Sequence, residues 1–227
     1  MSDRYGRTWV YESIVGAIPG LSLPDRIAVA VQFVLFEALV LAVAAVYGYW
    51  NAVLPGTVAV AVAAAGSAFM LDMGRRVRTL SLPDAYTRLL FGSSVEVVLG
   101  VLAYVALVTY LFVVDPRDGA TLLERLFGPT PAAPAVALAL LVLWDVCYRI
   151  GTGWWAAVLA AYRELRYAFD GETAAELRAL DSRNVGFALL QLVLVPLLGD
   201  QPLLALAVVG HVLAVGSVVA VARLSSS

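Results

Sequence analysis

Long apolar stretches separated by short polar segments run through the whole chain. Each stretch is near the roughly 20 residues that a helix needs to cross the hydrocarbon core of a bilayer. We place six spans at residues 27–49, 52–73, 89–114, 135–160, 184–199 and 202–222. The pattern predicts an all-α polytopic membrane protein with six transmembrane helices, in which residues 27–223 form a single membrane domain and residues 224–227 a short tail.

The N-terminal segment, residues 1–26, precedes the first span. Between residues 8 and 18 the apolar and aromatic side chains, Trp9 and Tyr11 among them, gather on one broad side of a helix. This pattern predicts a short helix lying in the membrane interface, with an unstructured lead-in as the alternative. Because Trp9 and Glu12 stand where a signal peptide needs an unbroken apolar core, we expect no cleaved leader.

Two longer polar segments also carry helix signals. The segment between the third and fourth spans predicts a short amphipathic helix from Ala120 to Phe127, before a proline-rich exit. Residues 161–183 predict a continuation of the fourth span, a break at Asp170–Gly171 and then a second helix. In that helix Thr173 and Glu176 have the spacing of a capping box.

Composition supports a membrane protein and narrows the classes of function. Of the 227 residues, 62% are hydrophobic, whereas a soluble domain has roughly 45–50% apolar residues. The net charge of -2 argues against nucleic acid as a partner. With one histidine and one cysteine, we expect no metal site and no cofactor such as haem, and the single cysteine excludes an internal disulfide.

The distribution of the arginines predicts an orientation. The chain has no lysine, and most arginines precede the first span, follow the sixth, or lie in the second and fourth gaps. Only Arg117 and Arg125 lie in the gaps on the other side. Cytoplasmic segments carry the excess of basic residues. We therefore predict a multi-pass protein of the cell membrane with both termini in the cytoplasm.

A short internal repeat suggests how the spans pair. The sequence LSLPD occurs at residues 21–25 and again at 80–84, each time shortly before a span. Glu37 and Glu96 each lie twelve residues after the aspartate of the repeat, so they occupy equivalent places. The repeat predicts three two-helix hairpins related by rotation about the membrane normal. The alternative is that LSLPD recurs only as a helix-start signal.

Polar residues inside the spans form the candidate site. A charged side chain in the middle of a membrane helix is costly, so it usually faces protein, water or a partner charge. Asp145 and Arg149 are four residues apart in the fourth span, share one helix face and can form an ion pair. The candidates for an ion path are Glu37, Glu96, Asp145, Tyr148, Arg149, Gln191 and His211.

Each of these groups also has a purely structural interpretation. Asp145 and Arg149 can be a locked pair that aligns helices. Glu37 and Glu96 can serve as protonated hydrogen-bond donors. His211, a lone histidine among small residues, is more typical of a hydrogen-bonded core residue than of a ligand.

We expect a small transporter or channel for a cation or protons, with a path lined by Glu37, Glu96 and Asp145, and not an enzyme. The alternative is a non-catalytic scaffold or partner subunit that docks a protein or membrane lipids through cytoplasmic arginines: Arg75, Arg76, Arg78, Arg163 and Arg166. Either protein could work as a homo-oligomer or with a partner membrane protein. A hydrolase using Ser67 and His211 is a third hypothesis, although nothing in the sequence orients this pair.

Overall fold

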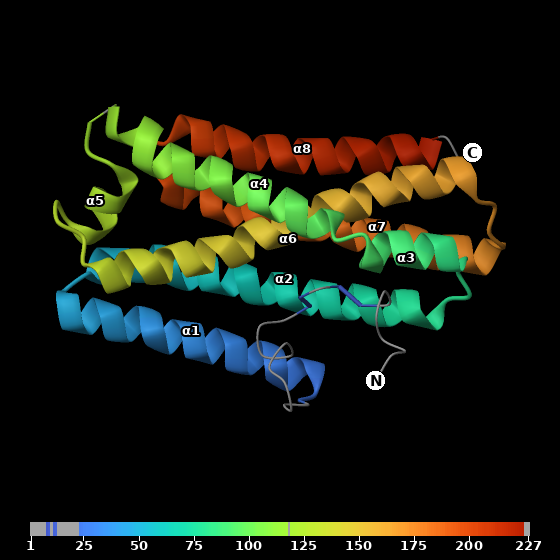
Figure 1. The fold of residues 1–227 in the computed structure, drawn as a ribbon, viewed down its shortest axis with the longest axis horizontal. Helices are drawn as coiled ribbons and strands as arrows, with labels where there is room; N and C mark the ends of the chain where they lie inside the picture. The colour runs from blue at the N-terminus through green and yellow to red at the C-terminus, as the bar shows by residue number, and fades with distance from the viewer. Residues whose placement is uncertain (1–7, 10, 13–22, 118, 225–227) are drawn as a thin grey trace.

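The computed structural model describes residues 8, 9, 11, 12, 23–117 and 119–224. Over these residues the chain forms helices and no strand. Six helical segments are long and apolar enough to cross a membrane, and they lie side by side along the long axis of the molecule (Figure 1). The predicted all-α membrane fold with six spans is confirmed.

The described elements follow the chain with short connections. In order they are α1 (Asp25–Tyr47), η2 (Trp50–Ala52), α2 (Val53–Thr79), α3 (Asp84–Gly92), α4 (Val95–Thr109), η3 (Tyr110–Val114), η4 (Asp115–Arg117), α5 (Leu122–Phe127), α6 (Ala133–Arg166), α7 (Gly171–Leu190), η5 (Gln191–Leu198) and α8 (Pro202–Leu224). The third span comprises α3, α4, η3 and η4, and the fifth comprises α7 and η5.

Helix α6 lies at the centre of the bundle. It contacts α1, α2, α3, α4, α7 and α8, so it touches every other span. Consecutive spans pack as antiparallel neighbours: α1 with α2, α4 with α6, and α8 with both α7 and η5. This pairing agrees with three hairpins, whereas a rotational repeat among them stays a prediction.

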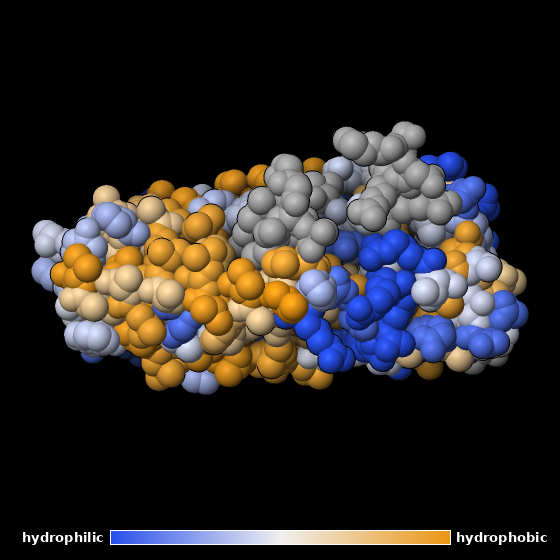
Figure 2. Space-filling view, turned by 90° about the horizontal axis from the view of Figure 1, so that it is seen from below, coloured by the Kyte–Doolittle hydropathy of each residue, from blue (hydrophilic) through white to orange (hydrophobic). Residues whose placement is uncertain are grey.

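The two ends of the bundle differ in polarity. At one end, here called the arginine end, α2 finishes with Arg75, Arg76 and Arg78, α1 begins and α8 ends. At the other end, here called the α5 end, α5 lies across the bundle (Figure 1). Figure 2 shows hydrophobic residues over the middle of the molecule and a strongly hydrophilic region towards the arginine end. This distribution matches spans with an apolar central band.

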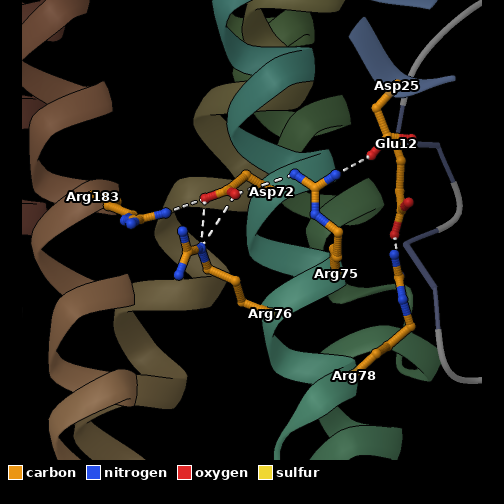
Figure 3. Close-up of polar contacts among 7 residues, drawn as sticks. All are labelled: Glu12, Asp25, Asp72, Arg75, Arg76, Arg78 and Arg183. Carbon is orange, nitrogen blue, oxygen red and sulfur yellow. Dashed lines mark hydrogen bonds and ion pairs between the residues drawn. The ribbon is translucent and has the colours of Figure 1, made fainter.

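A network of ion pairs joins three helices at the arginine end (Figure 3). Asp72 of α2 accepts hydrogen bonds from Arg76, at 3.1 Å, and from Arg183 of α7. Arg75 donates to Asp72 at 3.3 Å and to Asp25 of α1 at 2.9 Å. Because these groups are partly exposed, each pair contributes little stability. Their arrangement nevertheless fixes α1, α2 and α7 relative to one another.

The helix predicted over residues 8–18 is not seen at its described positions. Thr8, Trp9, Tyr11 and Glu12 are non-helical, and the rest of that range lies outside the described residues. Trp9 is buried and packs edge-on against Phe91 of α3, with ring centroids 5.0 Å apart. Trp9 thus packs within a buried hydrophobic cluster with residues of α2 and α3, which lie far from it in the sequence.

Several spans extend beyond their predicted limits. The second continues to Thr79, the predicted continuation of the fourth runs to Arg166, and the helix predicted after Asp170–Gly171 is continuous with the fifth span. The predicted limits followed the apolar stretches, but a helix satisfies its backbone internally and need not stop at the edge of the bilayer. Pro196, which lacks an N–H, lies in the tighter helical turns of η5.

The two predicted loop helices are present, with one correction. Helix α5 begins at Leu122, inside the predicted range, and has a capping box formed by Thr121 and Glu124. The break before α7 lies at the predicted place, but the cap is Asp170, whose side chain accepts from the backbone N–H of Thr173. The predicted capping box of Thr173 is therefore wrong, because the aspartate three residues earlier already satisfies that N–H.

The Asp170 cap makes the first turn of α7 sensitive to pH. The hydrogen bond from the backbone N–H of Thr173 lowers the pKa of the Asp170 carboxyl below its ordinary value. A group with a lowered pKa stabilises the fold above its unfolded pKa and loses this contribution as pH falls through the folded value. We expect Asp170→Ala to speed amide exchange at Glu172 and Thr173 at pH 7, measured by NMR. An equal rate in the parent would contradict the cap.

Candidate functional site

Five residues from four parts of the chain form a buried hydrogen-bonded group, here called the central polar cluster: Tyr11, Gln32 of α1, Ser67 of α2, and Asp145 and Arg149 of α6. Asp145 and Arg149 form the predicted ion pair, with Nη2 2.9 Å from Oδ1, and their side chains are 3% and 1% exposed. The hydroxyl of Tyr11 donates to Oδ1 of Asp145 at 2.8 Å, and Nε2 of Gln32 donates to Oδ2 at 3.1 Å.

Ser67 closes the cluster into a ring. Its hydroxyl donates to Oε1 of Gln32 at 2.9 Å and accepts from Nη2 of Arg149 at 2.8 Å. Room for Arg149 comes from the glycine next to Ser67, since a Cβ on Gly66 would lie 2.6 Å from Cγ of Arg149. Small residues of this kind allow close approach of helices in membranes. The ring explains how two charges are tolerated, because buried ions need both a partner charge and further hydrogen bonds.

The N-terminal residues cover the cluster on one side. Nη1 of Arg149 donates to the backbone carbonyl of Glu12 at 3.1 Å, and the guanidinium lies 4.9 Å from the ring centroid of Tyr11. Burial, and then the neighbouring Asp145 carboxylate, raise the pKa of the Tyr11 hydroxyl above its ordinary value. Tyr11 therefore stays protonated and acts as a donor. Glu12 is held in turn by Arg78 of α2, at 2.8 Å.

The other predicted path residues do not all join this cluster. Tyr148 packs beside it, since its ring lies 4.9 Å from that of Tyr11, but its hydroxyl has no hydrogen-bond partner among the described residues. Glu37 is half-buried and accepts a hydrogen bond from Thr57 of α2 at 2.8 Å. Glu96 is fully buried in the first turn of α4. The equivalence that the repeat suggested is lost, because α1 is continuous at Glu37 whereas the third span is interrupted just before Glu96.

Gln191 and His211 are buried elsewhere. Gln191 begins η5, and its Oε1 has no hydrogen-bond partner among the described residues. His211 of α8 packs against Trp154, with ring centroids 6.1 Å apart. Ser67 is bonded to Gln32 and Arg149, and no described residue bonds to Nδ1 of His211. The structure therefore gives no support to a nucleophile and base pair of Ser67 with His211.

Two cavities lie near the cluster, on the side of the α5 end. A small one of about 10 Å³ is lined by Gln32, Val142 and Asp145, with other residues of α1 and α2, and is about the size that one water needs. A larger one of about 560 Å³ lies between the spans and is also lined by Val142. Asp145 therefore borders the small cavity, and Val142 lies between this cavity and the larger one.

Comparison with known protein families gives a match over residues 4–222, to a family described as "Family of unknown function (DUF7530)". The chain belongs to this family. The match runs from before Tyr11 to near the end of α8, so it includes all of the central polar cluster. Neither the curated proteins nor the solved structures give a match.

The arginines proposed as docking residues lie in two different settings in this DUF7530 member. Arg75, Arg76 and Arg78 are partly exposed and paired with carboxylates. Arg166 is exposed. Arg163 is only 2% exposed and donates to Asp181 of α7 at 2.5 Å. It belongs to a buried ion pair and is not available at the surface.

Sequence reasoning recognised some cluster members but not their association. Asp145 and Arg149 are neighbours on one helix, and this local spacing identified them. Gln32 and Asp145 are separated by 113 positions, and Tyr11 and Asp145 by 134. The available signal was that Gln32 and Ser67 are polar residues inside apolar spans, where an unpaired polar group is costly.

Proposed function

We propose that this protein is a small transporter of the cell membrane that moves protons past the Asp145–Arg149 pair, with both termini and the arginine end in the cytoplasm. The proposal is supported by one observation above all: a buried ion pair borders a cavity of about 10 Å³ and is covered on one side by residues of the N-terminal segment. The distribution of arginines supports the orientation.

Protons suit this geometry better than hydrated metal cations do. The large cavity has no charged side chain in its lining, and a cation would lose its hydration there without receiving ligands. A proton needs only a chain of hydrogen-bonding groups, as Asp145, Tyr11 and Gln32 offer. Protonation of Asp145 would weaken its bond to Arg149 and allow the guanidinium to move.

Proton flux into proteoliposomes with an enclosed pH-sensitive dye tests the proposal. We expect flux in the parent, and a fall of about tenfold or more in Asp145→Asn. The asparagine amide has a shape similar to that of the carboxyl group but cannot carry the proton. Asp115→Asn is the matched control, because Asp115 is also a buried carboxylate and lies at the α5 end, bonded to Gln201. We expect this control to retain parental flux.

A milder variant addresses the risk that Asp145→Asn does not fold. Tyr11→Phe removes one hydrogen bond to Asp145 and leaves the ion pair with Arg149 in place, so we expect a folded protein with an altered rate. Flux of sodium, potassium and magnesium is measured in the same proteoliposomes, at both signs of membrane potential. Absence of proton flux in the parent, or equal flux in parent and Asp145→Asn, would refute proton transport through this pair.

A second candidate is a non-catalytic scaffold or partner subunit. It is supported by the closed state of the cluster, since both carboxylate oxygens of Asp145 already accept hydrogen bonds from within the protein. This candidate predicts that changes at Asp145 alter stability alone and that the parent shows no flux of any ion. The same proteoliposome series therefore separates the two functions.

A further inference from the structure

The half of the bundle near the α5 end contains a large apolar cavity that is open along part of its margin. Its volume of about 560 Å³ lies within the roughly 300–1,000 Å³ typical of small-molecule sites. Residues of α1, α2, α4, α5, α6, η5 and α8 line it, and these are nearly all Ala, Val, Leu, Pro, Gly and aromatic residues. We propose that this cavity binds a lipid-like molecule from the bilayer that has a long apolar body and a single hydroxyl or carbonyl group.

A polar side chain in the cavity wall gives the site its specificity. His211 is 7% exposed and lines the cavity, and its imidazole forms no hydrogen bond among the described residues. The two tyrosine hydroxyls in the lining are already engaged: that of Tyr49 accepts from the backbone N–H of Ala132 at 3.0 Å, and that of Tyr110 donates to Gln201. A buried polar group without a partner is costly, so the imidazole favours a ligand with one hydrogen-bonding oxygen.

The end of the cavity towards α5 is covered. Leu123 and Phe127 of α5 are part of the lining. Helix α5 is held there by Asp115, whose Oδ2 accepts from the backbone N–H of Leu122 at 2.7 Å and whose Oδ1 accepts from Gln201 at 2.7 Å. Entry of a water-soluble ligand along the bundle axis is therefore blocked on this side.

The margins of the cavity point to entry from the membrane. Ala106 of α4, and Leu203 and Ala207 of α8, line the cavity and are exposed. They lie in two spans, within the apolar part of each. A molecule dissolved in the bilayer can reach this opening without crossing water, and the apolar lining suits a hydrocarbon chain.

Quenching of tryptophan fluorescence by a brominated long-chain alcohol tests the inference, with the purified protein in nanodiscs of unbrominated phosphatidylcholine. Trp154 lines the cavity and is the reporter. We expect saturable quenching in the parent and loss of the saturable part in Trp154→Phe. Quenching that rises without saturation and is unchanged in Trp154→Phe would show simple partitioning into the bilayer and overturn the inference.

The role of His211 has its own test. We expect His211→Leu to weaken binding of the brominated alcohol by about threefold to tenfold, the loss of one hydrogen bond. The variant should bind the corresponding brominated alkane, which has no polar group, as well as the parent does. An equal loss for both probes would assign His211 to packing and not to recognition.

A pair of matched variants tests the location. Ala207→Phe places a ring at the cavity margin and is expected to abolish saturable quenching. Ala220→Phe makes the same change on an exposed part of α8 that does not line the cavity, and parental binding is expected. Equal binding in both variants would place the ligand elsewhere. None of these readouts depends on proton flux, so the two proposals can fail separately.

Discussion

Arg149→Met is expected to destabilise the protein by about 3–5 kcal/mol, the usual cost of removing one member of a buried ion pair. Methionine fills a similar volume, but Asp145 then keeps only its bonds from Tyr11 and Gln32 and loses its counter-charge. The backbone carbonyl of Glu12 also loses its donor. Equilibrium unfolding in mixed detergent micelles, followed by circular dichroism, measures this difference in free energy.

Two further variants determine whether the cost arises from the unpaired charge. The double variant Arg149→Met, Asp145→Leu removes both charges and is expected to recover much of the lost stability, because an apolar pair of similar volume can replace a buried ion pair. Arg166→Met changes an exposed arginine on the same helix and is expected within about 0.5 kcal/mol of the parent. Equal stability of the single and double variants would mean that the pair contributes through packing alone.

Gly151→Ala is expected to destabilise the protein by about 1–3 kcal/mol or more, the range seen when a tightly packed core is overfilled. A Cβ on Gly151 of α6 would lie 2.4 Å from the backbone nitrogen of Gly100 and 2.7 Å from the backbone oxygen of Glu96, both in α4. Backbone atoms cannot rotate away as a side chain can. The two helices would therefore have to separate where Gly151 faces Gly100.

The matched control is a glycine with free space around it. A Cβ added to Gly216 of α8 would meet no neighbouring atom within 4 Å. Gly216→Ala is therefore expected to be neutral or to stabilise the helix by up to about 1 kcal/mol. Unfolding of both variants under the same conditions gives the comparison. Similar stability of Gly151→Ala and Gly216→Ala would contradict the close approach of α4 and α6.

The polar residues of the spans show where local reasoning stops. The spacing of Asp145 and Arg149 within one helix was enough to predict their pairing, because that geometry is fixed by the helix itself. The same reasoning grouped Glu37, Glu96 and Asp145 along one path, yet the described contacts place Glu37 beside Thr57 and Asp145 beside Tyr11 and Gln32. Which helix faces which is not encoded in the spacing along one helix.

Arg163 gives a second example. Its position after the fourth span resembles that of Arg166, and the sequence predicts a surface role for both. In the structure α6 runs to Arg166, and on this helix Arg163 faces α7 and pairs with Asp181, whereas Arg166 stays exposed. Only the packing of α6 against α7 distinguishes the two arginines.

The sequence by itself determined that the chain is a helical membrane protein with six spans, because in lipid each span must satisfy its own backbone and must be long and apolar enough to cross. It also determined the Asp145–Arg149 pair, through a contact within one helix. The tertiary structure alone decided that Tyr11, Gln32 and Ser67 complete the cluster, that Arg163 is buried, and that a cavity of about 560 Å³ opens beside His211. These features join residues far apart in the chain, and only the packing of whole helices brings such residues together.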